Sequence, residues 1–287
     1  MPNSKHSRTR PEAQAISEWT PPRGTLGELV EAARERSRVL DNLSAGKTPV
    51  RSGADTLGAA LRGDHVALIA EVKRSSPSKG VINNAIDAGS QASMYEAGGA
   101  AAVSILTEPT RFGGSDSDID LARSRSALPV LKKDFHVTEA QIRQAAALDV
   151  AAALIIVRAI SPSMLVTLSD LARDLALELL YEVRDERELE RAVEVGARII
   201  GVNNRNLETL EIDRSTVSRI LPMIPPDCIA VAESGYATRA DIVEASMAGA
   251  DAVLVGSTLS SSTDPARAVR SLAGVNRLPR HPLQRPS

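Results

Sequence analysis

The chain has 287 residues, of which 43% are hydrophobic but only 2% aromatic, and its formal net charge at pH 7 is −2. This length suits one large α/β barrel or two modest domains. A core built from Ala, Val, Leu and Ile favours parallel α/β layers over an aromatic-rich β-sandwich. The small charge and scarce aromatics argue against binding to nucleic acid or to a membrane surface. A phosphate ligand would therefore need a local site.

The single cysteine, Cys228, excludes an intramolecular disulfide and a cysteine-cluster metal site. It lies in an apolar run, which indicates a buried small hydrophobe. No apolar stretch reaches membrane-spanning length, and the N-terminus lacks the apolar segment of a secretory signal. We therefore expect a soluble, cytoplasmic protein.

The first elements in chain order are a polar tail and a helix. Residues 1–24 carry four prolines and scattered arginines, which predicts a mobile tail, and residues 275–287 have the same character. A helix is predicted at about 25–43. Its apolar stripe consists of Leu26, Leu29, Val30, Ala33 and Val39.

From residue 67 onward, eight strand-sized apolar runs recur, and a helical pattern follows each. They lie at 67–73, 101–106, 129–133, 151–157, 177–183, 198–203, 228–233 and 251–256. Eight such units predict a single (β/α)8 TIM barrel over residues 66–274. An open doubly wound sheet is the alternative. It usually has fewer strands and often starts with a Gly-rich dinucleotide turn, whereas KRSSPSKG follows the first strand here.

Several of the intervening helices have recognisable ends. In Asp185–Gly196, acidic residues open the helix and a glycine closes it, while Leu189, Ala192 and Val193 are predicted on its inner face. Thr238 is a predicted N-cap for the helix that follows the seventh strand.

Charged and polar residues stand where the apolar strands end. Charges are rare inside buried strands because desolvation is expensive. The carboxyl ends of barrel strands form the active-site face, so these residues predict one polar pocket. They are Glu71 and Lys73 at the first strand, Lys132 and Lys133 at the third, Glu182 at the fifth, Asn203 and Arg205 at the sixth, and Glu233 with Ser234 at the seventh.

Alternation along a strand places Glu71 and Lys73 on one face, the barrel interior. They form either a pair that binds substrate and sets proton affinities or an ion pair that closes the barrel. Of Lys132 and Lys133, only one can enter the pocket. A partly buried lysine can act as a general acid because desolvation brings its pKa towards neutrality; two solvated lysines are the alternative.

The fifth strand carries two carboxylates on one face. Glu182 is the better base candidate because it is nearer the mouth than Glu178. At the end of the next strand, Asn203 and Arg205 can bind a carboxylate or hydroxyls, unless they serve only loop hydrogen bonds.

Three turns suggest an anion site. SSPSKG (75–80) offers Ser, Gly and exposed amides after the first strand. ESGYATR (233–239) and VGSTL (255–259) each put Gly beside Ser just before a helix. Barrels often bind phosphate at the loops after strands seven and eight.

Together these segments resemble the indole-3-glycerol phosphate synthase family, and the likeness spans about residues 65–273 in the right order. The matching stretches are IAEVKRSSPSKG (69–80), AAAVSILTE (100–108), RFGGS (111–115), PVLKKDFHVTEAQI (129–142), YEVRDERELERAVEVGARIIGVNNRNLETLEID (181–213), AESGYATRADI (232–242) and AGADAVLVGSTL (248–259).

The resemblance implies a role for each candidate. Lys133 would be the general acid that activates the substrate ketone, and Glu182 would act in acid/base work during dehydration. Lys73, with Glu71 as its partner, would position substrate and shuttle protons. The remaining implied residues are Asn203 and Ser234, which orient substrate; Glu233 and Arg205 in the substrate pocket; Ser76, Gly235, Gly256 and Ser257 at the phosphate; and Phe112 and Phe135, the only phenylalanines, at the anthranilate ring.

The implied reaction converts 1-(2-carboxyphenylamino)-1-deoxyribulose 5-phosphate to indole-3-glycerol phosphate, with release of CO₂ and water and without metal or cofactor. The resemblance also implies that the helical extension, residues 25–65, covers the barrel mouth. We expect a monomer or weak homo-oligomer whose partner is a small phosphorylated substrate.

One alternative is an isomerase like phosphoribosylanthranilate isomerase, although that enzyme uses a cysteine and Cys228 begins its strand at the far end. The other is a non-catalytic ligand-binding paralogue.

Overall fold

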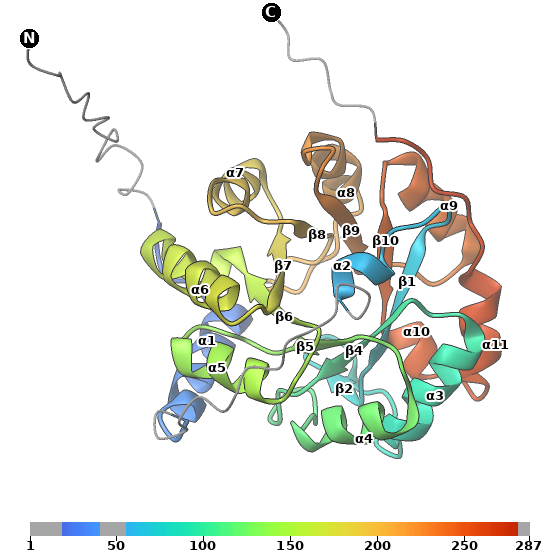
Figure 1. The fold of residues 1–287 in the computed structure, drawn as a ribbon, viewed down its shortest axis with the longest axis horizontal. Coiled ribbons are helices and arrows are strands. Elements are labelled where there is room, and N and C mark those ends of the chain that lie inside the picture. The colour runs from blue at the N-terminus through green and yellow to red at the C-terminus, as the bar shows by residue number, and fades with distance from the viewer. Residues whose placement is uncertain (1–18, 41–55, 281–287) are drawn as a thin grey trace, which may run out of the picture.

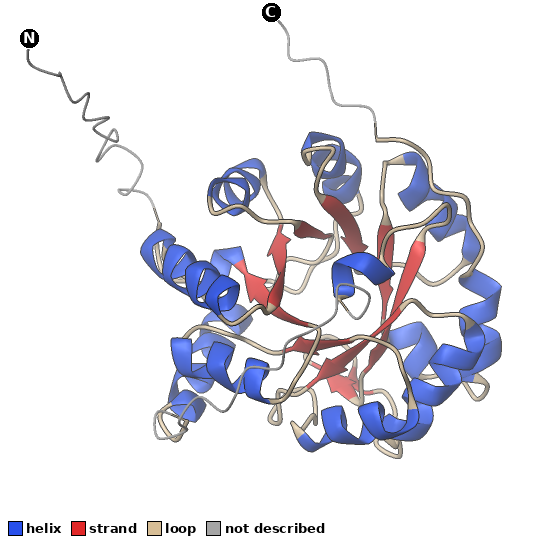
Figure 2. Cartoon of the chain, in the orientation of Figure 1, coloured by secondary structure: helices blue, strands red, loops and turns tan. Residues whose placement is uncertain are grey.

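The computed structural model describes residues 19–40 and 56–280. Eight parallel strands close into a barrel, and Figures 1 and 2 show the strands as an inner ring with helices outside it. In ring order the strands are β1 (Ala67–Val72), β4 (Ala102–Leu106), β5 (Val130–Lys133), β6 (Ala152–Ile156), β7 (Glu178–Val183), β8 (Ile199–Asn203), β9 (Ile229–Glu233) and β10 (Ala252–Val255). Each overlaps one predicted strand, so the (β/α)8 prediction is confirmed.

The connections supply the outer layer and a few short elements. A two-residue-per-strand hairpin, β2 (Ser75–Ser76) with β3 (Gly80–Val81), follows β1 at the carboxyl end of the barrel. The helices are α3 (Ala88–Gly98), α4 (Ser117–Arg125), α5 (Glu139–Ala147), α6 (Pro162–Asp174), α7 (Glu186–Glu194), α8 (Ser215–Ile220), α9 (Arg239–Met247), α10 (Ser257–Ser260) and α11 (Pro265–Leu272), with single 3-10 turns η2 (Val157–Ala159) and η3 (Leu221–Met223). None of the described helices is long and apolar enough to cross a membrane.

The predicted helix starts are present, with one error on an inner face. Asp185 caps α7 by accepting a hydrogen bond from the Glu188 amide at 2.8 Å, and Thr238 caps α9. Val193 was expected to face inward but is 39% exposed. The buried face of α7 is centred on Leu189, so Val193 lies at its edge.

Helix α1 (Gly24–Ser37) lies across the carboxyl end of the barrel, which is the mouth. Its first residue follows Arg23, whose amide donates to Glu208 in the loop after β8 at 2.8 Å. At its other end, Arg36 contacts the loops after β4 and β5.

Most of the predicted apolar stripe of α1 is correct, since Leu26, Leu29, Val30 and Ala33 are buried. Val39 is 77% exposed because the helix ends before it, at Ser37. Residues 41–43 of the predicted helix lie outside the described residues.

Helix α2 (Leu57–Ala60) lies at the opposite, amino end of the barrel, in front of the ring in Figure 1. The Gly58 amide donates to Glu178 Oε2 at 2.8 Å, and Glu178 is the first residue of β7. Leu57 and Leu61 are fully buried there. The expectation that residues 25–65 as a whole cover the mouth is therefore wrong for α2, which plugs the floor instead. The same contact places Glu178 far from the mouth.

The described parts of the predicted tails are docked. Trp19 Nε1 donates to the Arg158 carbonyl at 3.4 Å, and the Val66 amide donates to the Val275 carbonyl at 2.8 Å. Residues 275–280 thus pack against the amino end of the barrel and are not a free tail. Residues 1–18 and 281–287 lie outside the described residues.

Arg280 fastens the C-terminal segment to the barrel floor. Its guanidinium donates to the carbonyls of Pro225, Cys228 and Gly249 at 3.1, 2.7 and 3.1 Å and to Asp251 at 3.0 Å. Only 7% of its side chain is exposed. Because charge-assisted hydrogen bonds at buried positions contribute more than exposed ones, this contact is a strong candidate for a stability determinant.

We expect Arg280→Met to lower the free energy of unfolding by about 1–3 kcal/mol, since it leaves buried carbonyls without donors. Urea denaturation measures this. Arg198→Met is the matched control: that arginine forms a largely exposed pair with Asp227, and its loss is expected to cost at most about 0.5 kcal/mol. Equal effects of both substitutions would contradict the assignment.

Candidate active site

The carboxyl ends of the strands open into a pocket of about 280 Å³. Helix α1 contributes Thr25 and Leu29 to its wall. Every predicted site residue except Glu182 lines it: Glu71, Lys73, Ser76, Phe112, Lys133, Phe135, Asn203, Arg205, Glu233, Ser234, Gly235, Gly256 and Ser257. The structure thus brings together residues from the ends of the barrel strands, from the first strand, β1, to the last, β10.

Glu182 lies just behind this wall, in an adjoining cavity of about 110 Å³ that it shares with Asn203 and Arg205. Its Oε2 is 3.3 Å from Lys133 Nζ, and its Oε1 accepts a hydrogen bond from Asn203 Nδ2 at 2.9 Å. The carboxylate is only 3% exposed. Both of its oxygens are therefore held by predicted site residues.

Lys133 is the centre of a cluster of buried carboxylates. Besides Glu182, its ammonium lies 3.6 Å from Glu233 Oε2, and Glu71 is close enough to act on its charge. Burial alone would lower the pKa of Lys133, but the negative charges of Glu182, Glu233 and Glu71 outweigh burial and raise it above its usual value. The expectation of a pKa moved towards neutrality is wrong, because the pattern of one strand does not reveal carboxylates on three others.

The pKa of Glu233 is also raised, but for a carboxyl group this favours the neutral form. Burial, offset in part by Lys133, and repulsion from Glu182 and Glu71 raise the pKa of Glu233 to about 8. Gly201 on β8 makes room for this carboxylate, since a Cβ there would lie 2.1 Å from Glu233 Oε1. A neutral carboxylic acid at pH 7 is therefore built into the pocket floor.

Lys73 and Glu71 form a direct ion pair, as alternation along β1 predicted. Glu71 is 2% exposed and the Lys73 side chain 18%, so the pair spans the boundary between barrel interior and pocket. Gly256 lies against it: a Cβ there would be 2.2 Å from Glu71 Oε1 and 2.9 Å from Lys73 Nζ.

The turn after β9 is held in an uncommon backbone conformation. Ser234 has φ of 65° and Gly235 has φ of 91°, and such conformations in non-glycine residues concentrate at functional sites. Buried Asn204 braces the turn, donating from Nδ2 to the Ser234 carbonyl at 3.0 Å. Asn204 is not among the predicted site residues, although it stands beside Asn203 at the same strand end.

Lys132 points away from the pocket, as alternation requires. Its ammonium is buried against the helix layer, where it donates to Thr107 Oγ1 at 2.9 Å and pairs with Asp116. The alternative of two solvated lysines is therefore excluded. Cys228 is buried at the amino end of β9 and donates from Sγ to the Ala197 carbonyl at 3.2 Å.

Two carboxylates at the pocket wall were missed, Glu108 and Asp134. Both follow directly after apolar strands, so the same strand-end signal that found Glu182 was present for them. Both also lie beside the two phenylalanines, whose ring centroids are 6.2 Å apart at an interplanar angle of 40°.

The fold is shared with solved structures of other functions. Thiamine phosphate pyrophosphorylase from Pyrococcus furiosus superposes with a TM-score of 0.53 at 15% identity, covering 72% of this chain and 93% of that one. A structure described as native KDPGal gives 0.51 at 16% identity, covering 71% and 91%. At such identities the likeness concerns the barrel alone.

Sequence relatives are far more similar. Indole-3-glycerol phosphate synthase 1 of Streptomyces coelicolor is 46% identical over 254 residues, 88% of this chain and 94% of the relative. The synthase of Streptomyces griseus is 45% identical over 258 residues, covering 89% and 96%, and that of a Parafrankia strain is 44% identical over 241 residues, covering 84% and 90%.

The family model described as indole-3-glycerol phosphate synthase matches residues 26–272, which includes all but the first two residues of α1, the whole barrel and every predicted site residue. With relatives this similar over nearly their full length, the chain belongs to the indole-3-glycerol phosphate synthase family.

Proposed function

We propose that this chain catalyses the ring closure of 1-(2-carboxyphenylamino)-1-deoxyribulose 5-phosphate to indole-3-glycerol phosphate, with Lys133 as the general acid. The observation that carries the proposal is the position of Lys133 Nζ, in the pocket and 3.3 and 3.6 Å from the carboxylates of Glu182 and Glu233. Family membership supplies the reaction, and the geometry supports the roles of individual residues.

In the first step, the Lys133 ammonium donates a proton to the ketone oxygen as the carbonyl carbon becomes electrophilic. The aryl ring carbon that bears the carboxylate attacks this carbon and forms the new C–C bond. The bond to the carboxylate then breaks, CO₂ leaves, and its electron pair restores the aromatic ring. The former ketone oxygen remains as a hydroxyl group on the new ring.

In the second step, this hydroxyl takes a proton from the Lys73 ammonium and leaves as water, while a proton is lost from the methylene carbon next to nitrogen. Glu182 is the proposed base, because it is buried and Asn203 and Lys133 fix both of its oxygens. The Lys73–Glu71 pair on the opposite wall positions substrate and moves protons. Ser234 and Arg205 are proposed to orient the substrate, with Phe112 and Phe135 against the aryl ring.

The phosphate is proposed to bind between the β2–β3 hairpin and the turns after β9 and β10. Ser76 on the β2–β3 hairpin, Gly235 after β9, and Gly256 with Ser257 after β10 line this wall. Their small side chains expose backbone amides, and barrels commonly bind phosphate after strands seven and eight.

The alternatives receive less support. An isomerase of the kind that uses a cysteine would need a thiol in the pocket, whereas Cys228 is buried at the amino end of β9. A non-catalytic paralogue would not need the acid/base residues that meet in the pocket beneath α1. A cytoplasmic location, a monomer or weak homo-oligomer, and independence from metal and cofactor stay predictions from the sequence.

We expect Lys133→Ala and Glu182→Gln each to lower kcat by about 10²–10⁴-fold, the usual size of a lost general acid or base. Indole fluorescence measures product formation. Glu178→Gln is the control for Glu182, since Glu178 lies on the same strand but contacts α2 at the barrel floor. Its turnover is expected to stay near wild type. Full activity of Lys133→Ala would end the proposed mechanism.

The pH dependence should report Glu233. Because the pKa of Glu233 is raised to about 8, the group is neutral below that pH and gains a negative charge above it. That charge repels an anionic substrate, so kcat/KM is expected to fall as the pH rises through about 8. Glu233→Gln, which stays neutral, should lack this descending limb; a limb that persists in the variant would assign it to another group.

Gly256→Ala is expected to displace the Lys73–Glu71 pair, which a Cβ would otherwise meet at 2.2 and 2.9 Å. Misplacement of such groups can lower turnover by about 10²-fold. Steady-state kinetics with a thermal melt separates this effect from unfolding. Gly63→Ala is the control, because nothing lies within 4 Å of a Cβ at that position. Wild-type kinetics for Gly256→Ala would contradict the close packing.

A further inference from the structure

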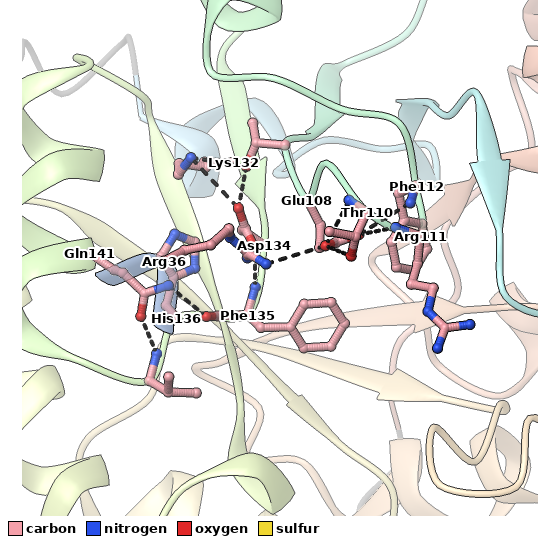
Figure 3. A network of polar contacts seen from close by, with 12 residues as sticks. Arg36, Glu108, Thr110, Arg111, Phe112, Lys132, Asp134, Phe135, His136 and Gln141 are labelled. Atoms are coloured by element: carbon pink, nitrogen blue, oxygen red, sulfur yellow. Dashed lines mark hydrogen bonds and ion pairs between the residues drawn. The ribbon is translucent and has the colours of Figure 1, made fainter. Parts of the chain in front are cut away.

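Glu108 and Asp134 accept hydrogen bonds from the backbone amides of the two pocket phenylalanines. Figure 3 shows the two carboxylates side by side. Glu108 Oε2 accepts from the Phe112 amide at 3.1 Å. Asp134 Oδ1 accepts from the Phe135 amide at 2.8 Å. The positions of both rings thus depend on carboxylates that themselves lie outside the acid/base cluster.

Glu108 organises the whole turn after β4. Its carboxylate also accepts from the amides of Thr110 and Arg111, at 3.0 and 2.7 Å. The side chain is 1% exposed. A carboxylate that accepts so many backbone donors fixes the path of residues 109–112 and hence the Phe112 ring.

Asp134 holds the start of the turn after β5 through the Phe135 amide, and its other oxygen is bonded to Thr107. Its Oδ2 accepts from Thr107 Oγ1 at 2.7 Å and lies 4.0 Å from Lys132 Nζ. Burial would raise the pKa of Asp134, but the positive charges of Lys132 and Arg36 hold it below its usual value. The group is therefore a charged acceptor.

One residue contacts both carboxylates, and it comes from outside the barrel. Arg36 on α1 reaches Glu108 Oε1 with Nη1 at 3.2 Å and Asp134 Oδ1 with Nη2 at 2.8 Å (Figure 3). A planar guanidinium can bridge two acceptors in fixed geometry, which an ammonium cannot do.

We propose that Arg36 is a positioning residue for the aryl end of the substrate: it clamps Glu108 and Asp134 together and thereby sets the separation of Phe112 and Phe135. Helix α1 then shapes the aryl pocket as well as covering the mouth. The proposal rests on the assignment of the two phenylalanines to the aryl ring under the proposed function.

Without Arg36, two carboxylates in a poorly solvated site would face each other with fewer positive neighbours. Breaking a buried pair by removing one partner leaves an uncompensated charge, and the turns can relieve it by moving apart. Such movement displaces the phenylalanine backbones directly. The β2–β3 hairpin meets this network at Ser75, whose amide and Oγ donate to the carbonyls of Phe112 and Arg111 at 3.3 and 2.9 Å. Within the described part of the chain, the turns after β9 and β10 form no hydrogen bond or ion pair with Arg36, Glu108 or Asp134.

The test compares Arg36→Met, Arg36→Lys and Arg38→Met by steady-state kinetics and by inhibition with anthranilate and with inorganic phosphate. Arg38 is the matched control, since it directly follows the same helix and, among the described residues, pairs with Glu35 at the surface. We expect Arg36→Met to raise KM and the inhibition constant of anthranilate by about 10-fold, with kcat and phosphate inhibition little changed, as for an interaction equal in ground and transition states. Arg36→Lys should be intermediate and Arg38→Met unaffected.

Equal weakening of anthranilate and phosphate inhibition in Arg36→Met would overturn the proposal, because it would indicate that α1 no longer covers the barrel mouth as a whole. So would behaviour identical to that of Arg38→Met. Phe112→Ala separates this failure from that of the assigned aryl pocket. If Phe112→Ala weakens anthranilate inhibition and Arg36→Met does not, only the role of Arg36 is wrong; if neither does, the aryl-pocket assignment fails.

Discussion

The contact of the Lys133 ammonium with the carboxylates of Glu182 and Glu233 is the interaction around which the rest of the site is arranged. Ionic groups at the centre of a barrel are costly to desolvate unless they compensate one another. Here one cation faces more than one carboxylate, so the excess is relieved by keeping Glu233 protonated at neutral pH. The cluster therefore holds a donor cation and a neutral acid in one pocket, and each depends on the charge state of the other.

The remainder of the barrel makes this cluster tolerable. Stability comes from the apolar layer between strands and helices and from the amino end, where α2 fills the floor and Arg280 fastens the C-terminal segment. The carboxyl end is thereby free to carry polar groups that oppose folding. Gly201 and Gly256 also help the barrel to hold these polar groups, since each leaves the space that a buried carboxylate occupies.

The parts of this arrangement that the sequence predicted are those encoded locally. Strand alternation places Glu71, Lys73 and Lys133 correctly, because the period of two and the end of each apolar run lie within a few residues. The raised pKa of Lys133 was not predictable in this way, since it arises from carboxylates on β1, β7 and β9. The position of α2 at the floor and the docking of residues 275–280 were not predictable either, because both depend on partners distant in sequence. Residues 275–280 have the polar composition of a tail, so their composition alone does not reveal the docking.

Helix α1 shows how a residue from outside the barrel can shape the substrate pocket. Its last turn provides the one guanidinium in the described part of the chain that meets both Glu108 and Asp134. Helix placement on a barrel mouth requires only an apolar stripe, and Leu26, Leu29, Val30 and Ala33 supply that. Specific contacts then need only a single long side chain at the right turn. The contribution of α1 to the substrate pocket therefore rests on a few long side chains, and it must be judged from their contacts rather than from the apolar stripe that docks the helix.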